Sequence, residues 1–423
     1  MATKTDDYFI RNVAGVAFVE LFWGLGFPIV LESTFLQLFL KNLGASSTLV
    51  GFVPSLFIFC ISTFPLFSTY LSRNYPLKRS LVGALHGFSG LAILALGLLL
   101  PCISEVDDVL ILFFSAYTVF SILMGLTIPI WFNYLTRIFS ESKTVPGLGY
   151  MMLAQNLGKI ISSFFILKIV DTYAFSLKSS AWVFIATGLL FILGSLCFLI
   201  TVEITDSAPS APDKTPFFRH TRQTFHEILT NRRFLIYLAA DLDFYVIITV
   251  LSFYANYATT YFAVPTAVAA GAFVAFIYAG SITVNILLGT MNLLGIKQKL
   301  FLSKGITLLL LILLTLIPSY FTFFIISFLL GIGRAIRNMV YPPSVRIFAN
   351  KSDNTAYFAL APILTLPIGS GFPLLFGTVL DSLSFMGADA YRLLFGFSAL
   401  FILATCYFAF KTDYERVPDT DNI

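Results

Sequence analysis

The stretch EITDSAPSAPDKTPFFRHTRQTFHEILTNRR, residues 203–233, divides this chain of 423 residues into two long hydrophobic halves. It holds five Lys or Arg and four Asp or Glu residues, so it must lie in water. In its second part, apolar residues recur at about helical spacing between charged ones, which predicts a short amphipathic helix that contacts the bilayer surface or covers a helix bundle. These apolar residues are Phe217, Phe218, Phe225, Ile228 and Leu229.

The composition excludes a soluble globular protein. Hydrophobic residues make up 58% of the chain and charged residues only 11%, whereas soluble domains carry about 25% charged residues. The net charge of +4 is small and reflects the loops, so we expect no nucleic-acid partner. The four cysteines are far apart and form no disulfide or metal pattern, and no cofactor is expected. They are Cys60, Cys102, Cys197 and Cys406.

Hydrophobic segments predict an all-α polytopic membrane protein. The N-terminal MATKTDDYFIRN lacks the layout of a cleaved signal, so the first segment is expected to remain as a span. A spanning helix needs about 20 apolar residues, and cutting the chain on that basis predicts two six-helix bundles, residues 1–202 and 234–423, joined by a cytoplasmic linker at 203–233. The twelve predicted spans are 13–40, 49–71, 81–100, 109–135, 148–170, 181–202, 234–262, 268–294, 300–317, 321–345, 356–380 and 391–410.

Basic residues indicate which loops face the cytoplasm. In the twelve-span arrangement nearly all of them fall on one side, which also holds both termini. We therefore expect a multi-pass protein of the cytoplasmic (inner) membrane with both termini in the cytoplasm. Outside the linker, the basic residues on this side are Lys4, Arg11, Arg73, Lys78, Arg79, Arg137, Lys143, Lys297, Lys299, Lys304, Arg346, Lys351, Lys411 and Arg416.

The two halves resemble each other in sequence. The stretch 42–52, NLGASSTLVGF, and the stretch 262–273, FAVPTAVAAGAF, share an apolar spacing that leads into a Gly, and each opens the second span of its half. The triplet at 137–139, Arg-Ile-Phe, recurs at 346–348 with nearly the same offset. Two parallel six-helix repeats joined by a linker are the layout of a large class of transporters.

Over essentially its whole length, the chain resembles a major facilitator superfamily permease. That family carries a Gly-x-x-x-Asp-Arg-x-Gly-Arg-Lys signature between its second and third helices. Here the loop at 68–79 reads STYLSRNYPLKR, which keeps the basic residues but lacks the Gly and the Asp. The related loop at 289–299, GTMNLLGIKQK, also lacks the acid. The resemblance assigns a gating role to Arg73, Lys78 and Arg79. In the family the acid of this loop joins the two halves by a charge pair, and without the acid the resemblance does not assign that contact to this chain.

Two further stretches resemble a bacterial branch of that superfamily. They are residues 19–46, VELFWGLGFPIVLESTFLQLFLKNLGAS, and the PLKRS at 76–80. The family's drug-antiporter signature, a Gly-Pro pair followed by glycines, is absent from the fifth predicted span, GLGYMMLAQNLGKIISSFF.

Ionisable residues inside spans are costly and mark functional sites. Glu20 in the first span and Asp241 in the seventh both lie roughly 10 Å from the inner ends of their helices, at about 1.5 Å per residue. Arg337 in the tenth span falls near that level, and Arg334 lies one turn deeper. The resemblance implies that the first, fourth, seventh and tenth helices line a central cavity, so these charges are expected to meet there.

Two interpretations of these charges are open. In the first, Arg334 and Arg337, which share a helix face, grip an anionic group of the substrate. In the second, Asp241 pairs with Arg337 and holds two helices together or closes a gate. Asp241 and Asp243 point to nearly opposite faces, so at most one of them can address the arginines.

Glu20 is the first candidate proton carrier because burial favours the neutral, protonated form of a carboxyl group. Asp241 is the second. The alternative for Glu20 is a permanent structural partner for Lys159, which lies near the middle of the fifth predicted span.

These observations predict a secondary active transporter rather than an enzyme. We expect it to bind a small organic solute, with an anionic group as the specific hypothesis, to work by alternating access with coupling to protons or another ion, and to function as a monomer among membrane lipids. Two alternatives of the same fold are an efflux pump for drugs or amphiphiles and a lipid flippase. A non-transporting membrane sensor is the alternative of another class.

Overall fold

The computed structural model of the protein describes residues 6–31, 34–72, 75, 77–204, 225–291, 293–349, 355–412 and 414. Within these ranges the chain is helical and contains no strand. Twelve helices are long and apolar enough to cross a membrane. This confirms the predicted fold class and the predicted number of spans.

The described residues form two compact units. Unit 1 contains those within 1–45, 56–214 and 265–275, and unit 2 contains those within 46–55, 215–264 and 276–423. Each unit therefore includes one short segment from the other half of the sequence. These segments, 46–55 and 265–275, fall almost on the two similar stretches at 42–52 and 262–273. The repeated sequence thus marks the places where each half packs its second span against helices of the opposite half.

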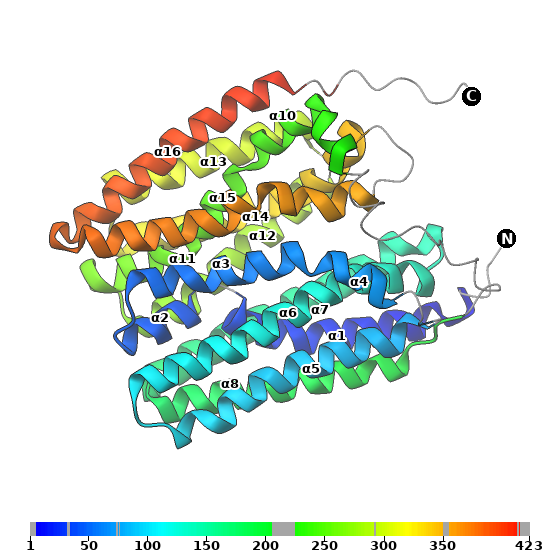
Figure 1. Ribbon diagram of the computed structural model, residues 1–423, viewed down its shortest axis with the longest axis horizontal. Coiled ribbons are helices and arrows are strands. Elements are labelled where there is room, and N and C mark those ends of the chain that lie inside the picture. Colours follow the sequence, from blue (N-terminus) through cyan, green and yellow to red (C-terminus); the bar gives the residue numbers. More distant parts are fainter. Residues whose placement is uncertain are drawn as a thin grey trace. The chain divides into compact units, whose positions relative to one another are not determined.

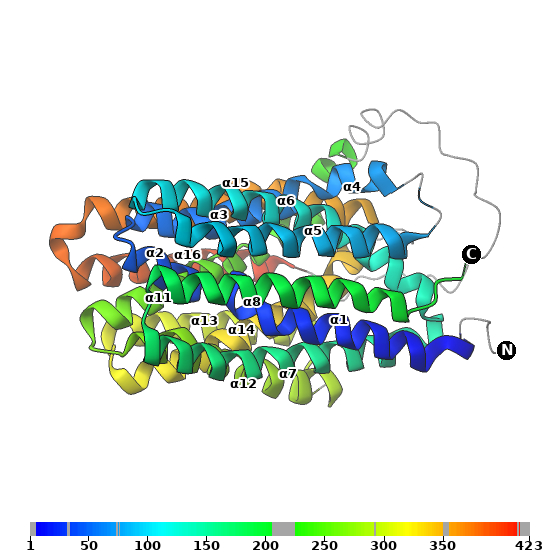
Figure 2. The ribbon, with the colours of Figure 1, turned by 90° about the horizontal axis from the view of Figure 1, so that it is seen from below.

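Unit 1 is built from long helices that pack in pairs, α1 against α7 and α5 against α8 (Figure 2). Its elements are η1 (Asp6–Tyr8), α1 (Phe9–Val30), α2 (Phe35–Asn42), the second part of α3 (Ser47–Thr63), α4 (Pro65–Ser72), α5 (Lys78–Leu99), η2 (Leu100–Cys102), α6 (Val106–Ile138), α7 (Glu141–Tyr173), α8 (Leu177–Leu196), η3 (Cys197–Ile200) and η4 (Val268–Ala272).

Two glycines bring α1 and α7 into backbone contact. A Cβ on Gly24 would collide with the carbonyl of Gln155, and a Cβ on Gly158 would lie 2.5 Å from the carbonyl oxygen of Leu21. Small residues allow this close approach between membrane helices. As a result, the polar side chains of the two helices, Glu20 and Gln155 among them, face each other at short range.

In unit 2, α13 packs against α14 and α16, and α10 packs against α16 (Figure 1). Its elements are the first part of α3, α10 (Arg232–Asp241), α11 (Asp243–Tyr261), most of α12 (Phe273–Val284), η5 (Asn285–Thr290), α13 (Ile296–Leu316), α14 (Tyr320–Ala349), α15 (Thr355–Ser382), η6 (Ser384–Met386) and α16 (Ala388–Lys411).

The segment 46–55 is anchored in unit 2 by Asp381, at the end of α15. Its carboxylate accepts hydrogen bonds from the backbone N–H groups of Ser47 and Thr48 at 2.7 and 2.8 Å and from the Thr48 hydroxyl at 2.5 Å. A carboxylate in this position satisfies the free N–H groups at the start of α3 and complements the helix dipole.

The linker predicted at 203–233 lies mostly outside the described residues, and so does the first part of its amphipathic helix. Residues 225–230 are helical. Ile228 is fully buried, and Glu227 accepts a hydrogen bond from the Tyr357 hydroxyl at 3.0 Å. Asn231 donates to the Phe348 carbonyl at 3.0 Å. The end of the linker is therefore packed against unit 2.

Candidate functional site

The seventh span is broken between its two acidic residues. α10 ends at Asp241, α11 begins at Asp243, and Leu242 lies between them. After the break the Tyr245 N–H bonds to the Leu242 carbonyl, three residues back. Both aspartates are buried, with 7% and 4% of their surface exposed. The two carboxylates, two residues apart, contact different cations.

Asp241 pairs with Arg337 of α14. Arg337 Nη2 lies 2.8 Å from Asp241 Oδ2, and Nε lies 3.3 Å from each carboxylate oxygen. The guanidinium carbon also lies 4.1 Å from the ring centroid of Phe244 and 4.0 Å from that of Tyr341. One-fifth of the Arg337 side chain is exposed. The fork of Arg337 is therefore held in one orientation by a carboxylate and two aromatic rings.

Asp243 pairs with Lys304 of α13. The Lys304 ammonium lies 2.9 Å from Asp243 Oδ1, 2.5 Å from the Ala240 carbonyl oxygen and 3.1 Å from the Thr405 hydroxyl of α16. None of the Lys304 side chain is exposed. The sequence analysis counted Lys304 with the basic residues of the cytoplasmic face. Instead it is an interior residue, because α13 begins at Ile296, earlier than the predicted span, and Lys304 lies about two turns inside it.

Two polar groups surround the Asp241–Arg337 pair. Tyr245 shares a hydrogen bond of 2.7 Å with Thr365 of α15. The hydroxyl of Tyr237, one turn before Asp241, is buried and has no hydrogen-bond partner among the described residues. Buried hydroxyls normally have a partner, so Tyr237 offers a free polar group beside the ion pair. Arg334 is half-buried on α14, one turn from Arg337.

Unit 1 holds a second buried cluster, where α1 meets α7. Glu20 is 6% exposed and accepts a hydrogen bond of 2.5 Å from the side-chain amide of Gln155. Lys159, one turn after Gln155, is 8% exposed and close enough to attract the Glu20 carboxylate. Its ammonium lies 5.1 Å from the ring centroid of Phe27. The structure thus brings Glu20 and Lys159 to the same helix interface.

The predicted gating residues lie at the start of α5, apart from Arg73, which is outside the described residues. The N–H groups of Lys78 and Arg79 donate to the carboxylate of Glu203 at 3.0 and 2.8 Å. The Glu203 carboxylate also lies 3.4 Å from the guanidinium of Arg137. Glu203 was not predicted as a site residue, because the family signature places its acid inside the loop. The signal was its place as the first residue of the polar linker.

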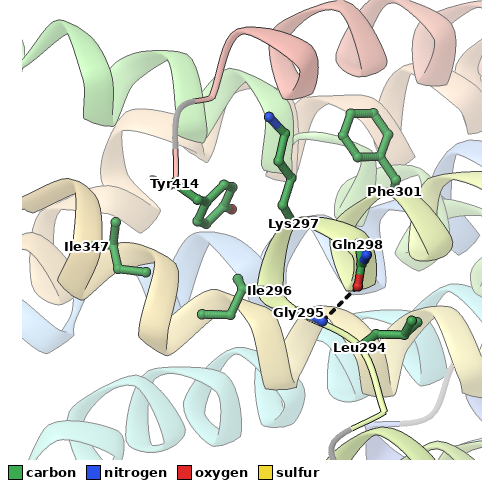
Figure 3. A pocket seen from close by; sticks show the side chains of 8 residues that line it. All are labelled: Leu294, Gly295, Ile296, Lys297, Gln298, Phe301, Ile347 and Tyr414. Atoms are coloured by element: carbon green, nitrogen blue, oxygen red, sulfur yellow. Dashed lines mark hydrogen bonds between the residues drawn. The ribbon is translucent and has the colours of Figure 1, made fainter. Parts of the chain in front are cut away.

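A cavity of about 870 Å³ lies at the start of α13 (Figure 3). Figure 3 shows Tyr414 between Ile347 and Lys297, with the Gly295 N–H bonded to the side chain of Gln298. Burial raises the pKa of Tyr414 to about 12, so its hydroxyl stays neutral at physiological pH. None of the lining residues is a predicted site residue. They are Leu294, Gly295, Ile296, Lys297, Gln298, Phe301, Ile347 and Tyr414.

In the part of the chain that the structure describes, no three His, Cys, Asp or Glu side chains gather where they could share a metal ion. The polar chemistry of the interior is instead that of paired charges on bundled helices. Twelve apolar helices among the described residues, in two units that each hold ionisable side chains inside, are the architecture of a polytopic membrane protein.

A family model described as Major Facilitator Superfamily matches residues 15–352. The chain belongs to that superfamily, which confirms the resemblance seen in the sequence. Comparison with curated proteins finds no match.

Solved transporter structures share the fold. The nucleoside transporter NupG is 12% identical, with a TM-score of 0.71 over 95% of this chain and 99% of that one. A POT family transporter in complex with 5-aminolevulinic acid is 14% identical, with a TM-score of 0.72 over 95% and 96%. A bacterial homolog of the human lysosomal transporter Spinster is 13% identical, with a TM-score of 0.64 over 97% and 98%. At these identities the likeness shows the fold alone.

Proposed function

We propose that the protein is a secondary active transporter that moves a small organic solute with an anionic group and couples it to protons. The observation that carries this proposal is the geometry of Arg337. Its guanidinium is fixed between two rings, its fork is paired to one buried carboxylate, and one-fifth of the side chain is exposed. Such a fork suits carboxylate and phosphate groups.

Coupling follows from competition for that fork. An ionised Asp241 pairs with the guanidinium of Arg337, whereas a protonated Asp241 does not. In the second case Phe244 and Tyr341 keep the guanidinium in place. A carboxylate or phosphate of the solute then takes the position that Asp241 leaves. The proton and the solute anion therefore bind together, and either one alone leaves a buried charge without its partner.

Four of the predicted residues, together with Tyr237, have supporting roles in this proposal. Glu20 is a second proton carrier, because its hydrogen-bond donor is the neutral amide of Gln155. Arg334 is a second cation for the anionic group, one turn from Arg337. The free hydroxyl of Tyr237 donates a hydrogen bond to the solute. Lys78 and Arg79, held by Glu203, belong to the gating end of unit 1.

We further propose a monomer of the cytoplasmic membrane with both termini in the cytoplasm. The side that carries most basic residues in the sequence supports this orientation.

The first test is a binding screen on purified protein in detergent, because a ligand that prefers the native state raises its apparent stability. The probes are small carboxylates, phosphate esters, organic cations, sugars, bulky hydrophobic cations and phospholipids. We expect a carboxylate or phosphate ester to stabilise the wild type but not Arg337→Ala. The matched control is Arg392→Ala, which removes an exposed arginine paired to Asp389 in the same unit.

Two results would contradict the proposal. If bulky hydrophobic cations or phospholipids alone stabilise the protein, and Arg337→Ala responds as the wild type does, an efflux pump or a flippase replaces the anion transporter. If a ligand binds but reconstituted protein moves none of it across a vesicle membrane, the protein is a sensor.

A further inference from the structure

The break in the seventh span forms a group of oxygen atoms around the ammonium of Lys304. The backbone carbonyl of Ala240 comes from the end of α10, the carboxylate of Asp243 from the start of α11, and the hydroxyl of Thr405 from α16. An ammonium group has three N–H donors. Each of the three oxygens can take one of them, so the charge is fully coordinated inside the protein.

These three oxygens satisfy all three N–H donors of a fully buried ammonium group. They come from three different helices, so a carboxylate, a carbonyl and a hydroxyl converge on one atom. Carbonyl, carboxylate and hydroxyl oxygens are the ligands of small hard cations. At interrupted membrane helices, unwound carbonyls and helix ends coordinate coupling cations such as Na⁺.

We propose that the break is a monovalent-cation site whose occupant is the side chain of Lys304. The tethered ammonium supplies the positive charge that a diffusible cation would supply in an open site. Na⁺ therefore has no access to this position in the native protein. When the lysine side chain is removed, the same three oxygens bind a small cation from solution. This inference concerns binding alone and stands whether or not the solute is an anion.

The test replaces the tethered cation by a free one in Lys304→Ala. Beyond Cβ, the lysine side chain has the atoms of n-propylammonium, which is thus the matched probe. Thermal unfolding of the full-length protein in detergent is followed while NaCl, n-propylammonium chloride or choline chloride is titrated at constant ionic strength. Choline has no N–H donor and a bulkier charged end than n-propylammonium, so it controls for ionic strength.

We expect n-propylammonium and Na⁺ to raise the midpoint temperature of Lys304→Ala saturably, by about 2–5 °C, with no such rise for choline. The wild type and Lys297→Ala, which removes an exposed lysine from the same helix, should respond equally to all three salts. Adding Asp243→Asn to Lys304→Ala should abolish the selective response, because the carboxylate is the strongest ligand.

Equal responses of Lys304→Ala to all three salts would overturn the proposal and leave Lys304 as a structural ion pair. Should Lys304→Ala fail to fold, Lys304→Ser leaves similar space and adds one oxygen, and it is purified with each salt in turn. Folded protein obtained with Na⁺ or n-propylammonium but not with choline supports the site. Folded protein with all three salts, or with none of them, counts against it.

Discussion

The buried charges of the two units are compensated in different ways. In unit 2, each of the carboxylates of Asp241 and Asp243 contacts a cation directly. In unit 1, the carboxylate of Glu20 accepts its hydrogen bond from a neutral amide, with a lysine one turn away. Protonating Asp241 or Asp243 removes the charge that a contacting cation faces, whereas Glu20 keeps its hydrogen bond from Gln155 in either form and loses its attraction to Lys159. This difference supports the proposed anion exchange at Arg337 in unit 2 and the proposed proton role of Glu20 in unit 1.

We expect the largest loss of stability when the fully buried cation Lys304 loses its paired carboxylate. Asp243→Asn removes the charge that neutralises Lys304, none of whose side chain is exposed. Breaking a buried ion pair in this way costs about 3–5 kcal/mol. The measurement is the free energy of unfolding in detergent.

Asp243→Leu combined with Lys304→Met is the control, because it removes both charges and should recover most of the loss. If the single variant is as stable as this double variant, the pair carries no such energy.

The second effect compares the two pairs within unit 2. Asp241→Asn should lower the free energy of unfolding by about 1–3 kcal/mol, which is less than the loss for Asp243→Asn. The loss is smaller because Arg337 keeps two ring contacts and some access to water. It should also remove the competitor for the guanidinium. Binding of the stabilising carboxylate or phosphate ester should therefore become independent of pH, whereas in the wild type it strengthens as the pH falls.

The readout is the dissociation constant of that ligand at several pH values for both proteins. Identical pH profiles would rule out Asp241 as the competing group. The matched control, Asp389→Asn, changes an exposed aspartate of the same unit and should leave the profile unchanged.

Most of the fold could be predicted from the sequence, because hydrophobic length alone defines a membrane span. The break at Leu242 could not. No Pro or Gly lies at Leu242, and the break is stabilised by Lys304 and Thr405, which are distant in sequence. The assignment of 46–55 to unit 2 likewise depends on Asp381, more than 300 positions away.

Buried charges can be predicted from the sequence more readily than their partners can. A charge inside an apolar run is visible in the sequence, so Glu20, Asp241, Asp243 and Arg337 could be singled out. Lys304 was assigned to the cytoplasmic face because it lies near the basic residues that open α13, and only packing against α10 and α16 shows that it is buried. The spacing of Asp241 and Asp243 allows only one of them to contact the arginines of α14. It does not identify Lys304 as the cation that Asp243 contacts.

The third effect tests the proton role of unit 1. Glu20→Gln keeps an oxygen that can accept the hydrogen bond of Gln155, so we expect a loss of only about 1 kcal/mol in stability. Transport of the solute into proteoliposomes should, however, no longer follow an imposed pH gradient. The matched control is Glu105→Gln, which neutralises an exposed glutamate of the same unit and should leave the response to the pH gradient unchanged. Full retention of the pH response by Glu20→Gln would remove Glu20 from coupling.

The smallest effect concerns the aromatic rings that hold the cations of the two units. Phe244 lies 4.1 Å from the Arg337 guanidinium carbon, whereas Phe27 lies 5.1 Å from the Lys159 ammonium. Attraction between a cation and a ring is worth about 0.5–2 kcal/mol, depending on desolvation. A planar guanidinium can also stack on a ring, which an ammonium cannot do. Phe244 should therefore contribute more than Phe27.

The comparison uses two double-mutant cycles, because Phe→Leu also removes buried apolar area. Phe244→Leu is measured in the wild type and in Arg337→Met, and Phe27→Leu in the wild type and in Lys159→Met. Each cycle isolates the coupling free energy between ring and cation. We expect about 1 kcal/mol for the Phe244 pair and less than about 0.5 kcal/mol for the Phe27 pair. A coupling energy near zero for the Phe244 pair would mean that this ring does not hold Arg337 in place when Asp241 releases it, which would contradict the exchange proposed for that pair.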